Sequence, residues 1–169
     1  MDNLQLLSDL EISTLKLLQC LSNFNKKKFN FSPDGKTWSA AQIAGHLLIL
    51  EVIANKALTG KTIPTNRSPD EKINLIKTVM SDINTKRIAP EVVQPSAELK
   101  DPQLMIEQIK FQRELLKKTI SEMEMTEACV SFKHPGIGTL TKLEWVYFTI
   151  FHTERHLQQL QRLENHLPQ

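Results

Sequence analysis

Residues 143–160 constrain the fold of this chain most, because their apolar side chains repeat with the period of an α-helix. The apolar stripe proceeds in steps of three or four residues and consists of Trp145, Phe148, His152, His156, Leu160 and Leu163. Two imidazoles, those of His152 and His156, therefore stand at positions where the pattern requires core residues. They lie one helical turn apart on nearly the same face. Their ring nitrogens are then close enough to share one metal ion, for which the rest of the chain must supply further ligands and a pocket.

The composition between the loops favours a protein made of helices. The 169 residues contain only five glycines, and Leu, Ile, Lys, Glu and Gln dominate the segments between the turn signals. This length suits a single domain, residues 1–169, with a sizeable core. The formal net charge is +2 with both signs interleaved, so we expect no nucleic-acid partner.

The sequence also predicts a cytoplasmic location. Its amino terminus lacks the basic segment and apolar run of a secretory signal. The longest apolar stretch, residues 40–58, is interrupted by His46, Glu51 and Lys56, so we expect no membrane-spanning segment. Cys20 and Cys129 lie far apart without CxxC spacing, which indicates reduced, buried thiols.

Four long amphipathic helices follow from the periodicity, over residues 4–24, 40–59, 102–126 and from 142 onward. The last three of these helices start with capping signals. The second and fourth begin with the capping boxes Ser39/Gln42 and Thr141/Glu144, and the third begins with an N-cap at Asp101 before a proline. Gly60 ends the second helix. Trp38, just before the first of these boxes, can fold onto Ile43 as a hydrophobic staple, and Leu140 can fold onto Trp145 in the same way.

A long crossover, residues 60–101, joins the second and third long helices. A capping box at residues 68–71 opens a further helix that runs to about residue 86, and three prolines make residues 89–101 irregular. Residues 25–36 and 133–138 are predicted to be loops. Four long helices with one long connection predict an all-α four-helix bundle, with the crossover helix appended to it.

A third histidine, His46, lies on or beside the inward face of the second helix. Burying a neutral histidine costs a few kcal/mol unless both ring nitrogens find partners, and a transition metal would satisfy three histidines at once. Three nitrogen ligands leave a fourth position open, as in catalytic zinc sites. The alternative is hydrogen-bonded core histidines, since an HxxxH pair also arises by chance. His46 can join only if the second and fourth helices face each other, which the spacing alone leaves open.

The pattern around the pair argues against a zincin-type protease. In the zincin motif HExxH a glutamate follows the first histidine, whereas here Glu154 lies two residues after His152, roughly 200° around the helix. No other general base can be assigned, so the catalytic residues stay unknown. Arg155 is interpreted as a surface or interface residue. Candidates for the pocket or for contacts with the metal ligands are His134, in the loop before the last helix, and the staple residues Trp38 and Trp145.

Three segments of the chain resemble the DinB-like (YfiT-type) superfamily. They read WSxxQIxxHL at residues 38–47, HPxxGxLT at residues 134–141 and FHTERHLxQL at residues 151–160. The resemblance implies a bundle with up-down-down-up connectivity that brings the second and fourth helices together. It further implies that His46, His152 and His156 hold nickel or zinc, and that the protein forms homodimers. Relatives include thiol S-transferases that use bacillithiol or mycothiol, a mycothiol-dependent isomerase and metal-dependent hydrolases.

The function predicted from these observations is that of a metal-dependent enzyme acting on a small molecule. The three-histidine site would activate either water, as in a hydrolase, or a low-molecular-weight thiol, as in an S-transferase. The alternative is a non-catalytic metal- or ligand-binding bundle. A third reading is a helical interaction protein whose histidines only form hydrogen bonds.

Overall fold

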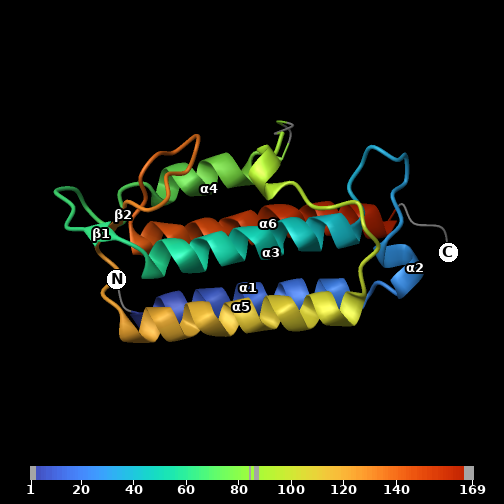
Figure 1. Cartoon of the computed structure of the whole chain (residues 1–169), viewed down its shortest axis with the longest axis horizontal. Coiled ribbons are helices and arrows are strands. Elements are labelled where there is room, and N and C mark those ends of the chain that lie inside the picture. The colour runs from blue at the N-terminus through green and yellow to red at the C-terminus, as the bar shows by residue number, and fades with distance from the viewer. Residues whose placement is uncertain (1–2, 84, 86–87, 166–169) are drawn as a thin grey trace.

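The computed structural model describes residues 3–83, 85 and 88–165. These residues form six α-helices, one 3₁₀ helix and two short strands (Figure 1). In chain order the elements are α1 (Asn3–Ser22), α2 (Lys26–Phe29), α3 (Ala40–Thr59), β1 (Thr62–Ile63), α4 (Ile73–Ser81), η1 (Glu91–Val93), α5 (Pro102–Glu122), β2 (Ala128–Cys129) and α6 (Lys142–Asn165).

The four long helices α1, α3, α5 and α6 form the predicted bundle. Helices α1 and α3 each pack against both α5 and α6, so the second and fourth long helices are direct neighbours. In Figure 1, α1 and α6 run from left to right, whereas α3 and α5 run from right to left. The predicted up-down-down-up connectivity is therefore confirmed.

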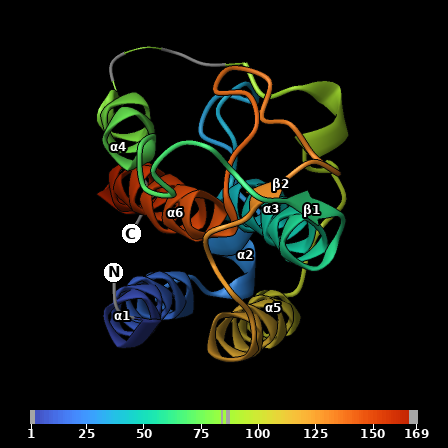
Figure 2. The same cartoon turned by 90° about the vertical axis from the view of Figure 1, so that its left-hand side faces the viewer.

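The crossover is a consequence of this connectivity. Helices α3 and α5 are parallel, so the chain must return along the whole bundle between them. On the way it forms α4, which packs on the outer side of α6 (Figure 2). The return starts at a small antiparallel ladder, in which Thr62 pairs with Cys129 and Ile63 with Ala128. These strands were missed because two residues are too few for a periodic signal.

The predicted capping signals of the long helices are present. Gln42 N–H donates to Ser39 Oγ at 3.2 Å, and Ser39 N–H donates to Gln42 Oε1 at 3.0 Å. The Thr141/Glu144 box closes in the same reciprocal way, with distances of 2.9 and 3.1 Å. The Asp101 carboxylate accepts two backbone N–H groups at the start of α5. These side chains satisfy donors that the first helical turn leaves unpaired.

The crossover helix differs from its prediction at both ends. Residues 69–72 form turns, and α4 begins at Ile73 without a side-chain cap. A tertiary contact explains this start, because the buried Glu144 carboxylate accepts the backbone N–H of Lys72 at 2.8 Å. The helix ends at Ser81, so the expected end near residue 86 was too late; residues 84, 86 and 87 lie outside the described residues.

Two loop segments also differ from expectation. Residues 25–36 include one helical turn, α2, which Asn25 caps and which buries Phe29 completely. The third long helix ends at Glu122 rather than near residue 126. At Gly60 the backbone is extended, with φ −82°, so a left-handed cap does not explain this glycine. A Cβ there would lie only 2.7 Å from Ser131 Oγ, and the close approach requires glycine.

The apolar core consists of two clusters separated by a polar level. Representative members are Leu10, Ala54, Leu116 and Ile150 on one side, and Leu17, Leu47, Ile109 and Leu157 on the other. Between them every long helix contributes buried polar side chains, which are Ser13 and Thr14 (α1), Glu51 (α3), Arg113 (α5) and Thr153 (α6). Arg113 donates to Glu51 Oε1 at 2.8 Å and to Thr153 Oγ1 at 2.6 Å. A buried ion pair thus joins α3 and α5, and a hydrogen bond from Arg113 to Thr153 joins them to α6.

Helix α3 is long and apolar enough to cross a membrane, judged by length and composition alone. This differs from the expectation that polar residues would interrupt such a segment. Most of the helix is buried between α5, α6 and the crossover, which accounts for its apolar character as that of a core helix. Cys20 and Cys129 are buried and free, as predicted.

Candidate metal centre

The three predicted ligands come together between α3 and α6. His46, His152 and His156 are buried, with exposed fractions of 4%, 9% and 6%. Their Nε2 atoms converge, since His152 Nε2 lies 3.4 Å from His46 Nε2 and 3.1 Å from His156 Nε2. Candidate ligand atoms of all three lie within 4.8 Å of one another. The sequence spacing alone could not place His46 beside the HxxxH pair. The packing of α3 against α6 brings it there.

Two of the histidines are oriented through their other ring nitrogen. His46 Nδ1 lies 2.6 Å from the backbone carbonyl oxygen of Val93 in η1. His156 Nδ1 lies 2.9 Å from the side-chain amide oxygen of Gln159. A carbonyl oxygen only accepts, so Nδ1 carries the hydrogen in both rings. Each Nε2 atom therefore presents a lone pair to the centre, the arrangement typical of metal-binding histidines.

The donor set fits a divalent transition metal. Tetrahedral zinc with Zn–N bonds of about 2.0–2.1 Å places its nitrogen ligands roughly 3.3 Å apart, close to the two distances in this cluster. Without an ion, His152 Nε2 could donate only one hydrogen toward the two neighbouring lone pairs. One buried acceptor would then stay unsatisfied, which costs about 1–3 kcal/mol. A cation would satisfy all three nitrogens.

Burial keeps the three rings neutral. It lowers the pKa of His46, although the hydrogen bond to Val93 works in the opposite direction. Burial and the neighbouring histidines hold the pKa of His152 well below its usual value. The pKa of His156 falls to about 3, chiefly through burial. Neutral imidazole is the form that binds a metal, so the ligands are ready at neutral pH.

Aromatic rings cover two sides of the centre. The Trp38 ring lies 5.1 Å from that of His46, and the Phe148 ring stacks on His152 with centroids 5.3 Å apart. Trp38 precedes the N-cap of α3, and Phe148 lies one turn before His152 on α6. These rings limit the access of solvent to the histidines from their sides.

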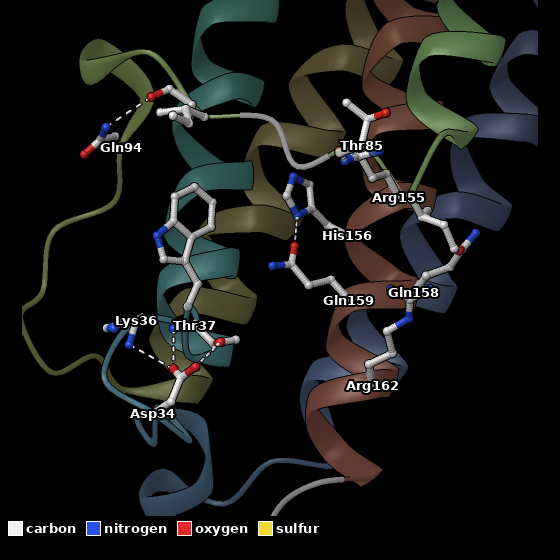
Figure 3. A pocket seen from close by; sticks show the side chains of 14 residues that line it. Asp34, Lys36, Thr37, Thr85, Gln94, Arg155, His156, Gln158, Gln159 and Arg162 are labelled. Atoms are coloured by element: carbon white, nitrogen blue, oxygen red, sulfur yellow. Dashed lines mark hydrogen bonds between the residues drawn. The ribbon is translucent and has the colours of Figure 1, made fainter.

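A pocket of about 570 Å³ opens beside His156 (Figure 3). Its walls come from the segment before α3, from the crossover and from the outer face of α6. Trp38, one of the candidate pocket residues, lies in its lining. Arg155, which was expected at the surface, also lines it. Its guanidinium donates to the carbonyl oxygens of Met80, Asp82 and Thr85 and so holds the end of α4 against α6.

The other two candidate residues lie outside this pocket. His134 Nδ1 accepts the backbone N–H groups of Gly136 and Ile137, and its ring lies 5.0 Å from that of Phe148. The Phe148 ring therefore contacts both His134 and His152. Trp145 is buried in the apolar core, with its ring centroid 5.6 Å from that of Phe148. Its indole N–H has no hydrogen-bond partner among the described residues.

Sequence reasoning missed the residues that orient the ligands. Gln159 follows His156 by three positions, a spacing that places both side chains on one helical face and could have identified it. Val93 contributes only its backbone carbonyl, for which the sequence holds no signal. The Glu51–Arg113 pair was also missed, although two ionisable residues on apolar helical faces were a sign of it.

Comparisons with known proteins agree with this architecture. A family model described as the DinB superfamily matches residues 9–160. The chain is 25% identical over 146 residues to a protein of Bacillus subtilis (strain 168) named YuaE and described as uncharacterized. That alignment covers 85% of this chain and 88% of the relative. No solved structure matches the chain.

Proposed function

This chain belongs to the DinB superfamily, and from that membership we propose that it is a metal-dependent enzyme acting on a small molecule. His46, His152 and His156 would bind one divalent ion, nickel or zinc. The observation that carries the proposal is the convergence of three Nε2 atoms while Val93 and Gln159 occupy the Nδ1 atoms of two rings. Such an arrangement leaves lone pairs that only a cation would satisfy together.

The bound ion would supply Lewis acidity, which makes water or a low-molecular-weight thiol nucleophilic at neutral pH. The chain itself holds two of the ligand rings, those of His46 and His156, in one tautomer. Trp38 and Phe148 shield His46 and His152, and the pocket admits a substrate beside His156. Asp34 is the only carboxylate among the described residues that line the pocket, and its oxygens accept hydrogen bonds from Lys36 and Thr37. The lack of an available base favours transfer by an S-transferase or simple hydrolysis over proteolysis.

The metal content of the purified protein tests the proposal directly. We expect about one nickel or zinc per chain by elemental analysis, and loss of that metal in His152→Ala. His134→Ala is the matched control, because it removes a partly buried histidine that does not reach the cluster. A folded wild-type protein that takes up no nickel or zinc would falsify the proposal.

The alternative is a non-catalytic bundle that binds a metal for stability. Both readings expect chelation to lower the melting temperature by several degrees, because an ion that binds only the native state stabilises it. Unchanged melting would instead support histidines that merely form hydrogen bonds. A panel of thiols with electrophiles, and a second panel of esters and amides, distinguishes enzyme from binding protein. Turnover in either panel that His152→Ala abolishes would establish catalysis.

The proposal includes a cytoplasmic homodimer without nucleic-acid or membrane partners. The net charge is only +2 and both signs are interleaved, which argues against a nucleic-acid partner. The two free, buried cysteines support a cytoplasmic location. The apolar side chains Ile12, Leu15 and Phe111 stand exposed on the outer faces of α1 and α5, where a second copy could cover them. Light scattering that gives twice the chain mass of 19.4 kDa would support the dimer.

A further inference from the structure

We propose that the pocket beside His156 selects a small amphiphilic anion, a molecule with an apolar part and a carboxylate or similar group. The inference rests on the proposed function, because it names the substrate class of the same centre. It is carried by the position of the pocket, by the contrast between its walls and by the charges that line it.

The pocket is suited in size and place to hold a substrate. Its volume of about 570 Å³ lies within the range of small-molecule sites. His156 forms part of its lining, so a molecule in the pocket lies against one of the three converging rings. A substrate held here would have one end near the metal ligands and the other toward solvent.

One part of the lining is apolar. Trp38, Ile83 and Ala89 line the pocket, and all three are partly buried. The Trp38 ring also packs against His46, so an apolar group lying on this indole would be close to the metal ligands. Contact with a large aromatic ring favours an apolar or aromatic group in the ligand.

The facing wall is polar and basic. Helix α6 contributes Arg155, Gln158, Gln159 and Arg162, and Figure 3 shows Gln158 and Arg162 across the pocket from Asp34, Lys36 and Thr37. Among the described residues, three basic side chains, Lys36, Arg155 and Arg162, line the pocket against one carboxylate. That carboxylate, Asp34, accepts backbone hydrogen bonds within its own loop at 2.6 and 2.9 Å. A ligand carboxylate facing Arg162 would meet a net positive lining.

Binding of two matched probes to the zinc-loaded protein tests this inference. The probes are 3-phenylpropionate and its neutral isostere 3-phenylpropanamide, with dissociation constants measured by calorimetry at pH 7 and fixed salt. We expect wild type to prefer the anion by about fivefold, the ratio that one partly exposed ion pair provides. Arg162→Gln should reduce this ratio to about twofold or less, because it removes the charge but keeps a polar side chain.

Lys110→Gln is the control, since it removes an exposed charge from α5 and leaves the pocket lining intact. It should keep the wild-type ratio. Equal binding of both probes to wild type, or no binding of either, would overturn the inference. So would a preference for the anion that survives Arg162→Gln but disappears when zinc is removed, because the carboxylate would then be bound by the metal alone.

Metal analysis of the same samples separates this inference from the proposed function. A protein that takes up no zinc but still prefers the anion through Arg162 contradicts the metal-dependent enzyme and supports the pocket. A protein that holds zinc but does not distinguish the probes contradicts only the pocket.

Discussion

Among single residues, two neighbours orient two of the three candidate metal ligands, His46 and His156. The Val93 carbonyl accepts from His46 Nδ1, and the Gln159 side chain accepts from His156 Nδ1. With Nδ1 held in this way, the Nε2 atom of each of these two rings points its lone pair toward the centre. Residues that orient metal ligands in this way typically contribute 10- to 100-fold to metal affinity. The affinity of the centre is therefore expected to depend on a residue that would not touch the ion.

Gln159→Leu tests this dependence. We expect metal affinity to fall by about 10- to 100-fold, because His156 loses the acceptor that fixes its tautomer and ring orientation. Competition with a chromogenic chelator measures the change. Gln158→Leu is the control, since that side chain also lines the pocket but forms no bond with His156 in the described structure. Equal affinities in both variants would show that Gln159 does not support the centre.

The histidines also predict how the metal-free protein responds to pH. Their pKa values are lowered in the folded state, whereas an unfolded histidine titrates near 6.5. The unfolded state therefore binds more protons below pH 6.5, and stability falls as the pH falls through that value. The loss can approach about 1.4 kcal/mol per pH unit for each ring. For His156 it would continue toward its folded pKa of about 3.

Urea unfolding of chelator-treated protein between pH 7 and 5 measures this slope, in a range where most carboxylates stay ionised. His156→Gln should flatten the slope because it removes one of the titrating rings. A stability that does not change over this range would contradict the neutral, buried state of the three histidines.

The candidate ligands could be predicted from the sequence because their positions interrupt a strong helical period. Placing His46 with the other two needed the neighbourhood of α3 and α6, which came from the family resemblance and which the packing confirms. The places of His134 and Trp145 could not be predicted, since loop geometry and core packing decide them. The backbone contact of Val93 is likewise a product of the tertiary fold.

Among the secondary-structure elements, capping boxes predicted the starts of α3 and α6 but not that of α4. The first two boxes close locally, between a side chain and the first turn. At α4 the Lys72 side chain bonds to the carbonyl oxygens of Ile137 and Thr139, and its backbone N–H bonds to Glu144. Contacts with a distant segment therefore set the start of that helix, and local signals do not include them.

Ser39→Ala should lower the free energy of unfolding by about 1 kcal/mol, because it leaves the N–H of Gln42 without its cap at the start of the helix that carries His46. Chemical denaturation of the metal-free protein measures the loss. Ser8→Ala is the matched control on the exposed side of α1, and its effect should stay within about 0.5 kcal/mol. Similar losses in both variants would mean that the cap does not stabilise the helix.

In the molecule as a whole, a level of buried polar side chains from all four long helices separates the two apolar clusters. Burial raises the pKa of Glu51, and its ion pair with Arg113 acts in the opposite direction. Glu51 Oε2, Arg113 Nη1, Ser13 Oγ and Asn55 Oδ1 are buried without hydrogen-bond partners among the described residues. Each such atom has lost its contact with bulk water without gaining a protein partner, which makes this level costly to bury.

Arg113→Met should destabilise the protein by about 3–5 kcal/mol, because it leaves the Glu51 carboxylate buried without its counter-charge. The double variant Glu51→Leu/Arg113→Met should recover most of that loss, since apolar side chains can fill the level between the clusters. Unfolding free energies of wild type, both single variants and the double variant complete the cycle. Additive losses would show that the two side chains are not energetically coupled.

The contact between Val93 and His46 is made by the peptide backbone, and every amino acid carries the same carbonyl group. Substitutions at position 93 can therefore accumulate while the acceptor stays in place, provided that the 3₁₀ turn keeps its shape. Insertions or deletions in residues 89–94 would instead shift the acceptor away from the imidazole. Homologues of this protein should accordingly tolerate drift in the identity of these residues, but very little drift in the length of the segment.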